Sequence, residues 1–320
     1  MGTGGATHGG RMSMSAPSAR GIWPRLSAAV AALPLALSGC SGESILDPVG
    51  PVGADDAQIL IDATLIMLAI IVPTILLAFY FAWRYRASNT KSEYLPYWSY
   101  SGRVEAVVWS IPILTIMFLG GVIWIGTYRL DPFRPLESAT PPLEVQVVSL
   151  DWKWLFIYPQ QRIATVNQLV VPAGVPVHFS ITSASVFNAF FVPRLGSMIY
   201  AMPGMVSQLH LQADRPAQLW GQSAMFSGDG FSDMQFQVHS VPPSQFAAWA
   251  QGARGGGQVL DLRAYQLLAR QSHNVPPMTF GNVDPRLFHA VATQRIPPAP
   301  GPEPANAEHA GREVTPAGRR

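Results

Sequence analysis

Two long uncharged stretches limit what this chain can fold into. Residues 63–83 and 106–128 contain no Asp, Glu, Lys or Arg. At ~1.5 Å per residue, a helix of about 20 residues crosses the roughly 30 Å hydrocarbon core of a bilayer. The whole chain is only 12% charged, against roughly 25% in ordinary soluble domains. The sequence therefore predicts two transmembrane helices, at residues 59–83 and 104–128, that form an antiparallel hairpin.

The charges around these stretches predict the orientation of the hairpin. The loop 84–103 carries Arg84, Arg86, Lys91 and Arg103 against Glu93 alone, and short positive loops stay in the cytoplasm. Residues 40–58 hold four acidic residues and no Lys or Arg. We therefore expect a multi-pass protein of the bacterial inner membrane, with a short periplasmic segment at 40–58 and the C-terminal part in the periplasm.

The N-terminal region is typical of an export signal. Residues 1–39 contain a positive region followed by a short apolar stretch, and the first eleven residues look dispensable because Met12 or Met14 could start the chain. The apolar stretch ends at Cys40, within a sequence that resembles a lipobox, so residues 1–39 are interpreted as a lipoprotein signal peptide and Cys40 as the lipidated residue. An ordinary signal peptide or a buried thiol are the alternatives. Because Cys40 is the only cysteine, intramolecular disulfides and sites built on two thiolates are excluded.

The pattern changes after the second apolar stretch. Hydrophobic residues alternate with polar ones from about 143 to 240, with Pro and Gly between the runs, which predicts seven or eight short strands in a β-sandwich or barrel over residues 129–242. Residues 243–291 read as a short helical arm, and residues 292–320 as a disordered tail. The predicted fold class is thus membrane α plus all-β. The net charge of +2 gives no indication of nucleic-acid binding.

Three segments carry a family resemblance. Residues 104–112 (VEAVVWSIP), 151–159 (DWKWLFIYP) and 188–196 (NAFFVPRLG) resemble the second span, the aromatic segment and the first ligand stretch of subunit II of the haem–copper terminal oxidases. The resemblance covers roughly residues 40–290. It implies that the periplasmic domain has a cupredoxin-like fold.

In copper-bearing members of this family, the domain holds a binuclear copper centre whose second ligand stretch reads Cys-x-Glu-x-Cys-x-x-x-His-x-x-Met. The positions that match the family's metal-site pattern here are Asn188, Ser223, Met225, Ser227, Phe231 and Met234. Only the methionine is kept. Neutral hydroxyls are poor ligands for copper compared with thiolates, so we expect no metal. His178, His210 and His239 lie on separate predicted strands without a thiolate, and are not expected to replace the lost ligands.

A domain that keeps the family's characteristic segments but lacks its copper ligands resembles subunit II of quinol oxidases of the cytochrome bo type. The resemblance implies subunit II of a proton-translocating ubiquinol oxidase, which oxidises quinol and reduces oxygen to water. It also implies haems and copper in a separate subunit I, further subunits III and IV, and contact with membrane lipid and quinol through the complex. Cytochrome c is not an expected partner. A docking surface for a basic electron carrier needs an excess of acidic side chains, whereas residues 143–240 hold five acidic and four basic side chains.

Two further sites follow from the resemblance. Glu105 could be an acid at the membrane interface or one favoured by the helix dipole. The resemblance instead implies a proton-uptake role at the mouth of a channel shared with subunit I. Trp152, Trp154, Phe156 and Tyr158 occupy every second position, so all four side chains should lie on one face of a strand. We expect Trp152 and Trp154 in the sandwich core or in contact with subunit I.

Two rival functions remain. A copper-dependent cytochrome c oxidase subunit II would need two cysteines in the ligand loop, which holds none. A stand-alone membrane lipoprotein with a degenerate cupredoxin domain, acting in assembly or binding, would not need two full spans. Co-purification with a haem-containing partner would distinguish it from an oxidase subunit. The chain itself is expected to have no catalytic residue, so its enzyme activity is that of the complex.

Overall fold

The computed structural model describes residues 45–93 and 95–297. Cys40 and the expected signal peptide lie outside the described residues. The same holds for residues 298–320 of the expected tail.

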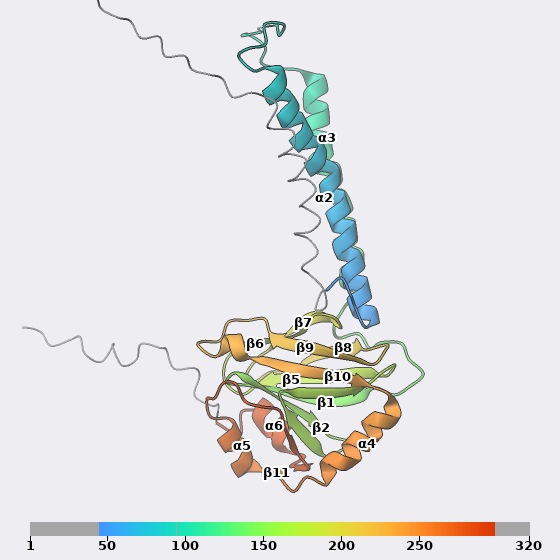
Figure 1. Cartoon of the computed structure of the whole chain (residues 1–320), viewed down its shortest axis with the longest axis vertical. Helices are drawn as coiled ribbons and strands as arrows, with labels where there is room; N and C mark the ends of the chain where they lie inside the picture. Colours follow the sequence, from blue (N-terminus) through green and yellow to red (C-terminus); the bar gives the residue numbers. More distant parts are fainter. Residues whose placement is uncertain (1–44, 94, 298–320) are drawn as a thin grey trace, which may run out of the picture. The chain divides into compact units, whose positions relative to one another are not determined.

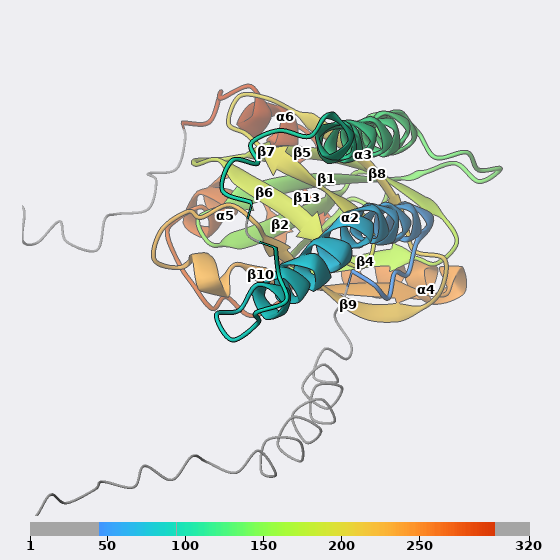
Figure 2. The same ribbon diagram turned by 90° about the horizontal axis from the view of Figure 1, so that it is seen from above.

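Two long helices form the predicted hairpin. α2 (Pro51–Arg84) and α3 (Gly102–Arg129) lie side by side (Figures 1 and 2), with mean hydropathies of 2.6 and 2.2 in their most apolar windows. Those windows are not buried inside the chain, so their side chains are available to lipid or to a partner. α2 begins earlier than the expected residue 59, because Val52, Gly53 and Ala57 are buried by contacts outside the hairpin.

The domain after the hairpin is a sandwich of two sheets (Figure 1). One sheet has the order β12-β3-β2-β1-β5-β8 and the other β4-β10-β9-β6-β7. The first ten strands are β1 (Leu143–Leu150), β2 (Lys153–Tyr158), β3 (Ile163–Val166), β4 (Gln168–Pro172), β5 (Pro176–Ser183), β6 (Asn188–Val192), β7 (Gly196–Ala201), β8 (Ser207–Gln212), β9 (Ala217–Ser223) and β10 (Gln235–Val241). The expected seven or eight strands were too few, because short strands such as β3 and β4, separated by one residue, read as one run in the sequence.

Both sheets are mixed rather than purely antiparallel. β1 pairs antiparallel with β2 but parallel with β5, and β10 pairs antiparallel with β9 but parallel with β4. A parallel pair needs a connection that crosses over the sheet, so strands distant in the sequence come together. This topology brings the start of β6 beside the end of β9, where the family's ligand positions lie.

The C-terminal arm is only partly helical, which corrects the expectation for residues 243–291. It contains α4 (Pro243–Arg254), β11 (Val259–Leu260), α5 (Leu262–Leu268), β12 (Met278–Phe280), β13 (Asn282–Val283) and α6 (Leu287–Ala292). β12 pairs with β3 and extends the six-stranded sheet. The consecutive prolines Pro276 and Pro277 cannot continue a helix, and the residue before a proline favours extended backbone, so the chain enters β12 extended.

The arm creates a second hydrophobic core. The first core lies between the two sheets and includes Trp154, Phe156 and Tyr158. The second lies on the other face of the six-stranded sheet, where Leu155 and Ile157 of the same strand pack with arm residues that include Tyr265 and Phe288. β2 is therefore buried on both faces.

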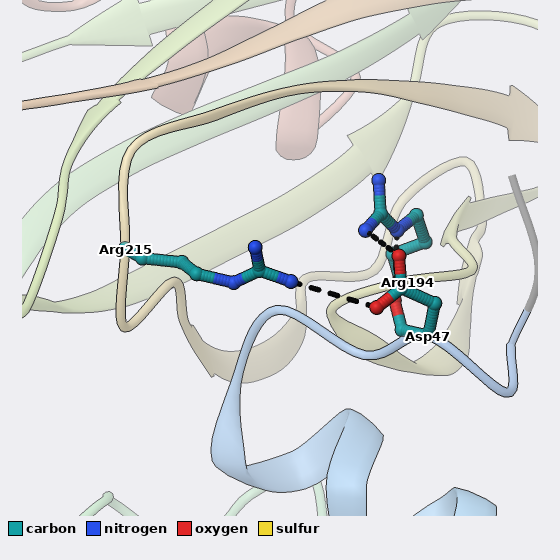
Figure 3. A network of polar contacts seen from close by, with 3 residues as sticks. All are labelled: Asp47, Arg194 and Arg215. Carbon is teal, nitrogen blue, oxygen red and sulfur yellow. Dashed lines mark hydrogen bonds and ion pairs between the residues drawn. The ribbon is translucent and has the colours of Figure 1, made fainter. Parts of the chain in front are cut away.

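The segment before α2 is bound to the sandwich. Arg194 donates from Nε to the carbonyl of Asp47 at 2.8 Å and pairs with its carboxylate, while Arg215 lies 3.5 Å from the same carboxylate (Figure 3). Val49 is buried, donates to the carbonyl of Arg194 and accepts from the amide of Asp214, both at 2.8 Å. A Cβ on Gly50 would come within 1.8 Å of the Gln212 carbonyl oxygen. Only glycine allows this close approach.

Candidate functional site

The six positions that match the family's metal-site pattern come together at one end of the five-stranded sheet. Asn188 begins β6 and Ser223 ends β9, and the loop that follows β9 runs through η2 (Phe231–Asp233) to Met234. The amide of Ser223 donates to the carbonyl of Met234 at 3.1 Å, and the amide of Ala224 donates to the carbonyl of Ala189 at 3.0 Å. The loop is thus closed on itself and attached to β6 by its backbone.

Two of these positions now hydrogen-bond each other. The hydroxyl of Ser223 lies 3.0 Å from Asn188 Oδ1, and both residues are buried. In a copper-bearing relative the matching residues would hold the metal between them. Here a neutral side-chain hydrogen bond links these two residues instead, next to the backbone pairing of β6 and β9.

The other positions also lack the groups that a copper pair needs. Ser227 Oγ lies 4.0 Å from Met234 Sδ, and both side chains are buried. Met225 and Phe231 offer a thioether and a ring in place of a carboxylate and an imidazole. Copper pairs require anionic sulfur bridges, so these residues do not fit the metal that the fold family implies. Among residues 45–93 and 95–297, no group of three His, Cys, Asp or Glu side chains has the arrangement of a metal site.

The loop shape depends on two glycines and on Trp152. Gly228 has φ +104°, a conformation that side chains rarely adopt. A Cβ on Gly230 would meet the ring of Trp152 at 2.3 Å. The indole nitrogen of Trp152 in turn donates to the carbonyl of Ser227 at 3.0 Å. The indole of Trp152 therefore holds the loop in place through a hydrogen bond to Ser227 and close packing against Gly230.

The two tryptophans expected as core or subunit contacts have different surroundings. Trp154 is fully buried, with its ring edge-on to Phe190 and Phe236 at 5.5 and 5.8 Å. Trp154 is thus part of the sandwich core, the first of the two expected positions. Trp152 is 6% exposed, and the arm residue His273 lies edge-on to it at 5.7 Å.

Lys153 is a site residue that the sequence analysis missed. It alternates with the tryptophans along the chain and is only 1% exposed. Its Nζ donates to the carbonyls of Asp151 and Arg270 at 3.0 and 2.7 Å and to Ser272 Oγ at 2.8 Å. Burial lowers the pKa of Lys153 to about 8, against the opposing effect of nearby Asp151. The apolar residues Leu155 and Ile157 on the same strand face were the available sign that this face is covered.

The arm also reaches the end of the loop. Asn274 Nδ2 donates to Asp233 Oδ2 at 3.1 Å, and His273 Nδ1 lies 3.8 Å from the same oxygen. Asn167 Nδ2 donates to the carbonyl of Val275 at 2.8 Å. Together with Lys153, these bonds hold residues 270–275 across the edge of the loop.

The histidines considered as substitute ligands are not gathered around the loop. His178 and His210 stack on neighbouring strands with ring centroids 4.5 Å apart, and they bond to Glu144 and to the carbonyl of Pro132. His239 lies 3.2 Å from the side-chain oxygen of Gln237. None of these hydrogen bonds and ring contacts involves Asn188 or Ser223.

Glu105 lies far from this loop in the sequence. It is exposed in the first turn of α3, where its amide donates to the carbonyl of Ser101 at 3.0 Å. The positively charged connection between the helices precedes it.

Comparisons with known proteins agree on one family. Residues 121–241 match the family described as cytochrome c oxidase subunit II, periplasmic domain, and residues 254–298 match the COX aromatic rich motif. The chain is 46% identical to the cytochrome bo(3) ubiquinol oxidase subunit 2 of Pseudomonas aeruginosa, over 87% of this chain and 84% of that protein. It is 48% identical to the ubiquinol oxidase subunit 2 of Acetobacter aceti, over 81% and 85%. The quinol oxidase subunit 2 of Bacillus cereus is 33% identical, over 83% and 94%.

Proposed function

The chain belongs to the family of ubiquinol oxidase subunit 2, and from this premise we propose that it works without a metal relay, as a structural and proton-uptake subunit of its complex. Membership makes it a subunit of a quinol oxidase, an oxidoreductase complex of the membrane. The observation that carries the proposal is the Asn188–Ser223 hydrogen bond, which joins the two strands at the position of the lost metal.

The missing relay indicates where electrons enter the complex. A periplasmic electron carrier would need a redox centre in this domain to receive its electron. A quinol dissolved in the membrane can deliver electrons directly to a partner subunit. We therefore assign the haems, the copper and the quinol site to subunit I, and give no electron-transfer step to this chain.

Metal analysis tests this assignment. The full chain, purified in detergent and incubated with excess Cu(II) and reductant, should retain far less than one copper per chain after desalting. A copper-bearing subunit II treated in the same way is the positive control. Retention of one or more copper ions per chain would overturn the proposal.

The second part of the proposal concerns Glu105. Glu105 is an exposed carboxylate in the first turn of α3, directly after the loop 84–103. The positive charge of that loop supports the cytoplasmic end of the helix as its location. An ionisable group at such a position is a functional candidate. We assign Glu105 to the uptake of protons that are delivered to the partner subunit.

Replacing Glu105 by Gln in the assembled oxidase tests this role. The substitution keeps the size of the side chain and removes its proton, so turnover and proton release should fall most at high pH, where protons are scarce. Glu93 of the cytoplasmic loop offers the matched control, as Glu93→Gln. Turnover of the Glu105 variant that equals wild type from pH 6 to 9 would contradict the assignment.

Lipid anchoring completes the proposal. Asp47 is bound to Arg194 and Arg215 at the periplasmic domain, only seven positions after Cys40. The lipobox-like sequence that ends at Cys40 supports lipidation of this residue. Intact mass of the N-terminal peptide from purified complex should show diacylation of Cys40, and an unmodified thiol would refute it. Subunits III and IV are proposed as further partners on the family resemblance.

A further inference from the structure

The outward face of the five-stranded sheet is rich in side-chain amides. Trp220 of β9 is 48% exposed, so it points away from the core between the sheets. Trp220 pairs with Gln237 of β10, which pairs on its other side with Gln168 of β4, so these three side chains form one row. Gln222 and Gln235 form the next row. We call the outward side chains of these two rows and of the neighbouring position on β9 the amide face, which consists of Gln168, Gln218, Trp220, Gln222, Gln235 and Gln237.

The amide face carries no charge. Strands β4, β9 and β10 contain no Asp, Glu, Lys or Arg, whereas about 25% of the residues in ordinary soluble domains are charged. Trp220 adds exposed apolar surface at the centre of this face, which costs free energy in water. A strand face that only meets solvent needs neither feature. Uncharged amides around an exposed indole therefore indicate a surface that binds a neutral ligand.

A groove of about 360 Å³ adjoins the amide face. Trp220, Gln235 and Gln237 line it from the sheet, and Asp233 and the arm residue Asn274 contribute to its lining. Asn274 Nδ2 donates to Asp233 Oδ2 at 3.1 Å, so these two side chains are held in one arrangement. The volume lies at the lower end of the roughly 300–1,000 Å³ of ligand pockets. The groove thus suits a small ligand or a short segment of a polymer.

The chemistry of the lining selects the class of ligand. A side-chain amide offers both donors and an acceptor, and a hydroxyl group likewise donates and accepts. Adjacent amides therefore match a molecule that carries several neighbouring hydroxyl groups. Gln237 is paired through its side-chain oxygen with His239 at 3.2 Å, which leaves its amide nitrogen to a ligand. The negative face of an indole attracts weakly positive C–H groups. A sugar ring presents hydroxyl groups at its edge and C–H groups on its faces, so it matches both kinds of side chain.

Other classes of ligand fit this surface less well. An anionic lipid or a nucleic acid would require Lys and Arg, and a basic protein would require an excess of acidic side chains. Protein interfaces are enriched in Tyr, Trp, Phe, Met and Arg, whereas amides outnumber the one aromatic ring of the amide face.

We propose that the amide face and its groove bind a neutral carbohydrate. Trp220 stacks on one face of a sugar ring, and Gln235 and Gln237 hydrogen-bond to its hydroxyl groups. The inference goes beyond the proposed function and does not depend on it, because it involves neither electron transfer nor proton uptake.

Saturation-transfer difference NMR tests the binding. The full chain is purified in a detergent without a sugar headgroup, because a glycoside detergent would compete for the groove. Maltose and N,N′-diacetylchitobiose serve as neutral probes. Saturation should pass from the protein to the ring protons of at least one of them. No transfer to either probe would overturn the proposal.

Variants of Trp220 test the stacking contact. Trp220→Ala should weaken the binding of the probe by at least about tenfold. Trp98→Ala is the matched control, because Trp98 is also exposed, at 62%, but lies in the loop between the two long helices. Trp220→Phe keeps an aromatic face and should retain the affinity within about threefold, which separates loss of stacking from loss of fold. Equal affinities for the Trp220→Ala and Trp98→Ala variants, or equal losses for Trp220→Ala and Trp220→Phe, would contradict the stacking role.

A substitution of Gln237 tests the amide contact. Gln237→Leu removes the hydrogen-bonding group and should weaken binding by about 2- to 10-fold. Gln251→Leu, at an exposed glutamine of α4, should leave the affinity unchanged. Saturation transfer that is equally strong in both variants and in the wild-type chain would show that the amide face does not hold the probe.

Discussion

Replacing Lys153 by Met removes the charge beneath the arm while it keeps the length of the side chain. In the wild-type chain, burial lowers the pKa of Lys153 from 10.5 to about 8. Between these two pH values the unfolded chain binds more protons than the folded chain, so the free energy of unfolding must rise with pH. Each pKa unit corresponds to about 1.4 kcal/mol, so the wild-type chain should gain about 2–3 kcal/mol between pH 7 and pH 10.

The hydrogen bonds of Lys153 allow this deprotonation. The neutral amine keeps two donors for the carbonyls of Asp151 and Arg270, and the hydroxyl of Ser272 can turn to donate to the amine lone pair. No contact of the buried nitrogen need be lost. The gain in stability should therefore not be cancelled by an unpaired polar group.

Thermal unfolding of the full chain in detergent, followed by tryptophan fluorescence, measures the effect. From pH 7 to pH 10, the midpoint of the wild-type chain should rise by roughly 5–10 °C relative to Lys153→Met. Lys91→Met, at an exposed lysine of the loop between the helices, should follow the wild-type profile. Above about pH 10 the raised pKa values of the buried Tyr158 and Tyr265 act in the opposite direction. Parallel profiles for wild type and Lys153→Met would refute the reasoning.

Three further outcomes can be checked on the same purified chain. Ser223→Ala leaves Asn188 Oδ1 without this hydrogen bond and should lower the free energy of unfolding by about 1–3 kcal/mol, measured by denaturant titration; a loss below 0.5 kcal/mol would argue against a stabilising bond. Gly230→Ala forces a methyl group against the ring of Trp152 and should destabilise by about 1–3 kcal/mol. Gly252 lies inside α4, where a Cβ would meet nothing within 4 Å, so Gly252→Ala should instead raise the free energy of unfolding by about 0.5–1 kcal/mol. Equal changes for the Gly230 and Gly252 variants would be inconsistent with the packing. Lowering the pH to 5 should not create copper binding, because hydroxyls and thioethers gain no affinity on acidification, as metal analysis would show.

Much of this architecture follows from local sequence pattern. Uncharged runs of the right length predict helices that cross a bilayer, and the arginines of the loop at 84–103 predict their orientation. The alternation of Trp154, Phe156 and Tyr158 predicts a strand with one aromatic face, and the structure confirms that these residues share a core. Such patterns are readable because helices and strands repeat over a few residues.

The organisation of the arm was less readable. Short segments such as β12, of three residues, have no period of their own, and they become strands only because the edge of β3 is available. The same long-range contact decides the environment of Lys153, whose neighbours Arg270 and Ser272 are more than 100 positions away. A single sequence gives no direct information about such contacts.

The loop at residues 223–234, which carries most of the family's ligand positions, shows what the sequence determines and what only the tertiary structure determines. The sequence by itself determined that no thiolate, imidazole or carboxylate stands at the matching positions, since residue type alone decides whether a copper ligand exists. Only the tertiary structure decided what replaces the metal, because Asn188 and Ser223 meet across two strands that lie 35 positions apart. It also decided which aromatic side chains are buried against the loop and which remain exposed, since burial depends on the packing of the whole domain.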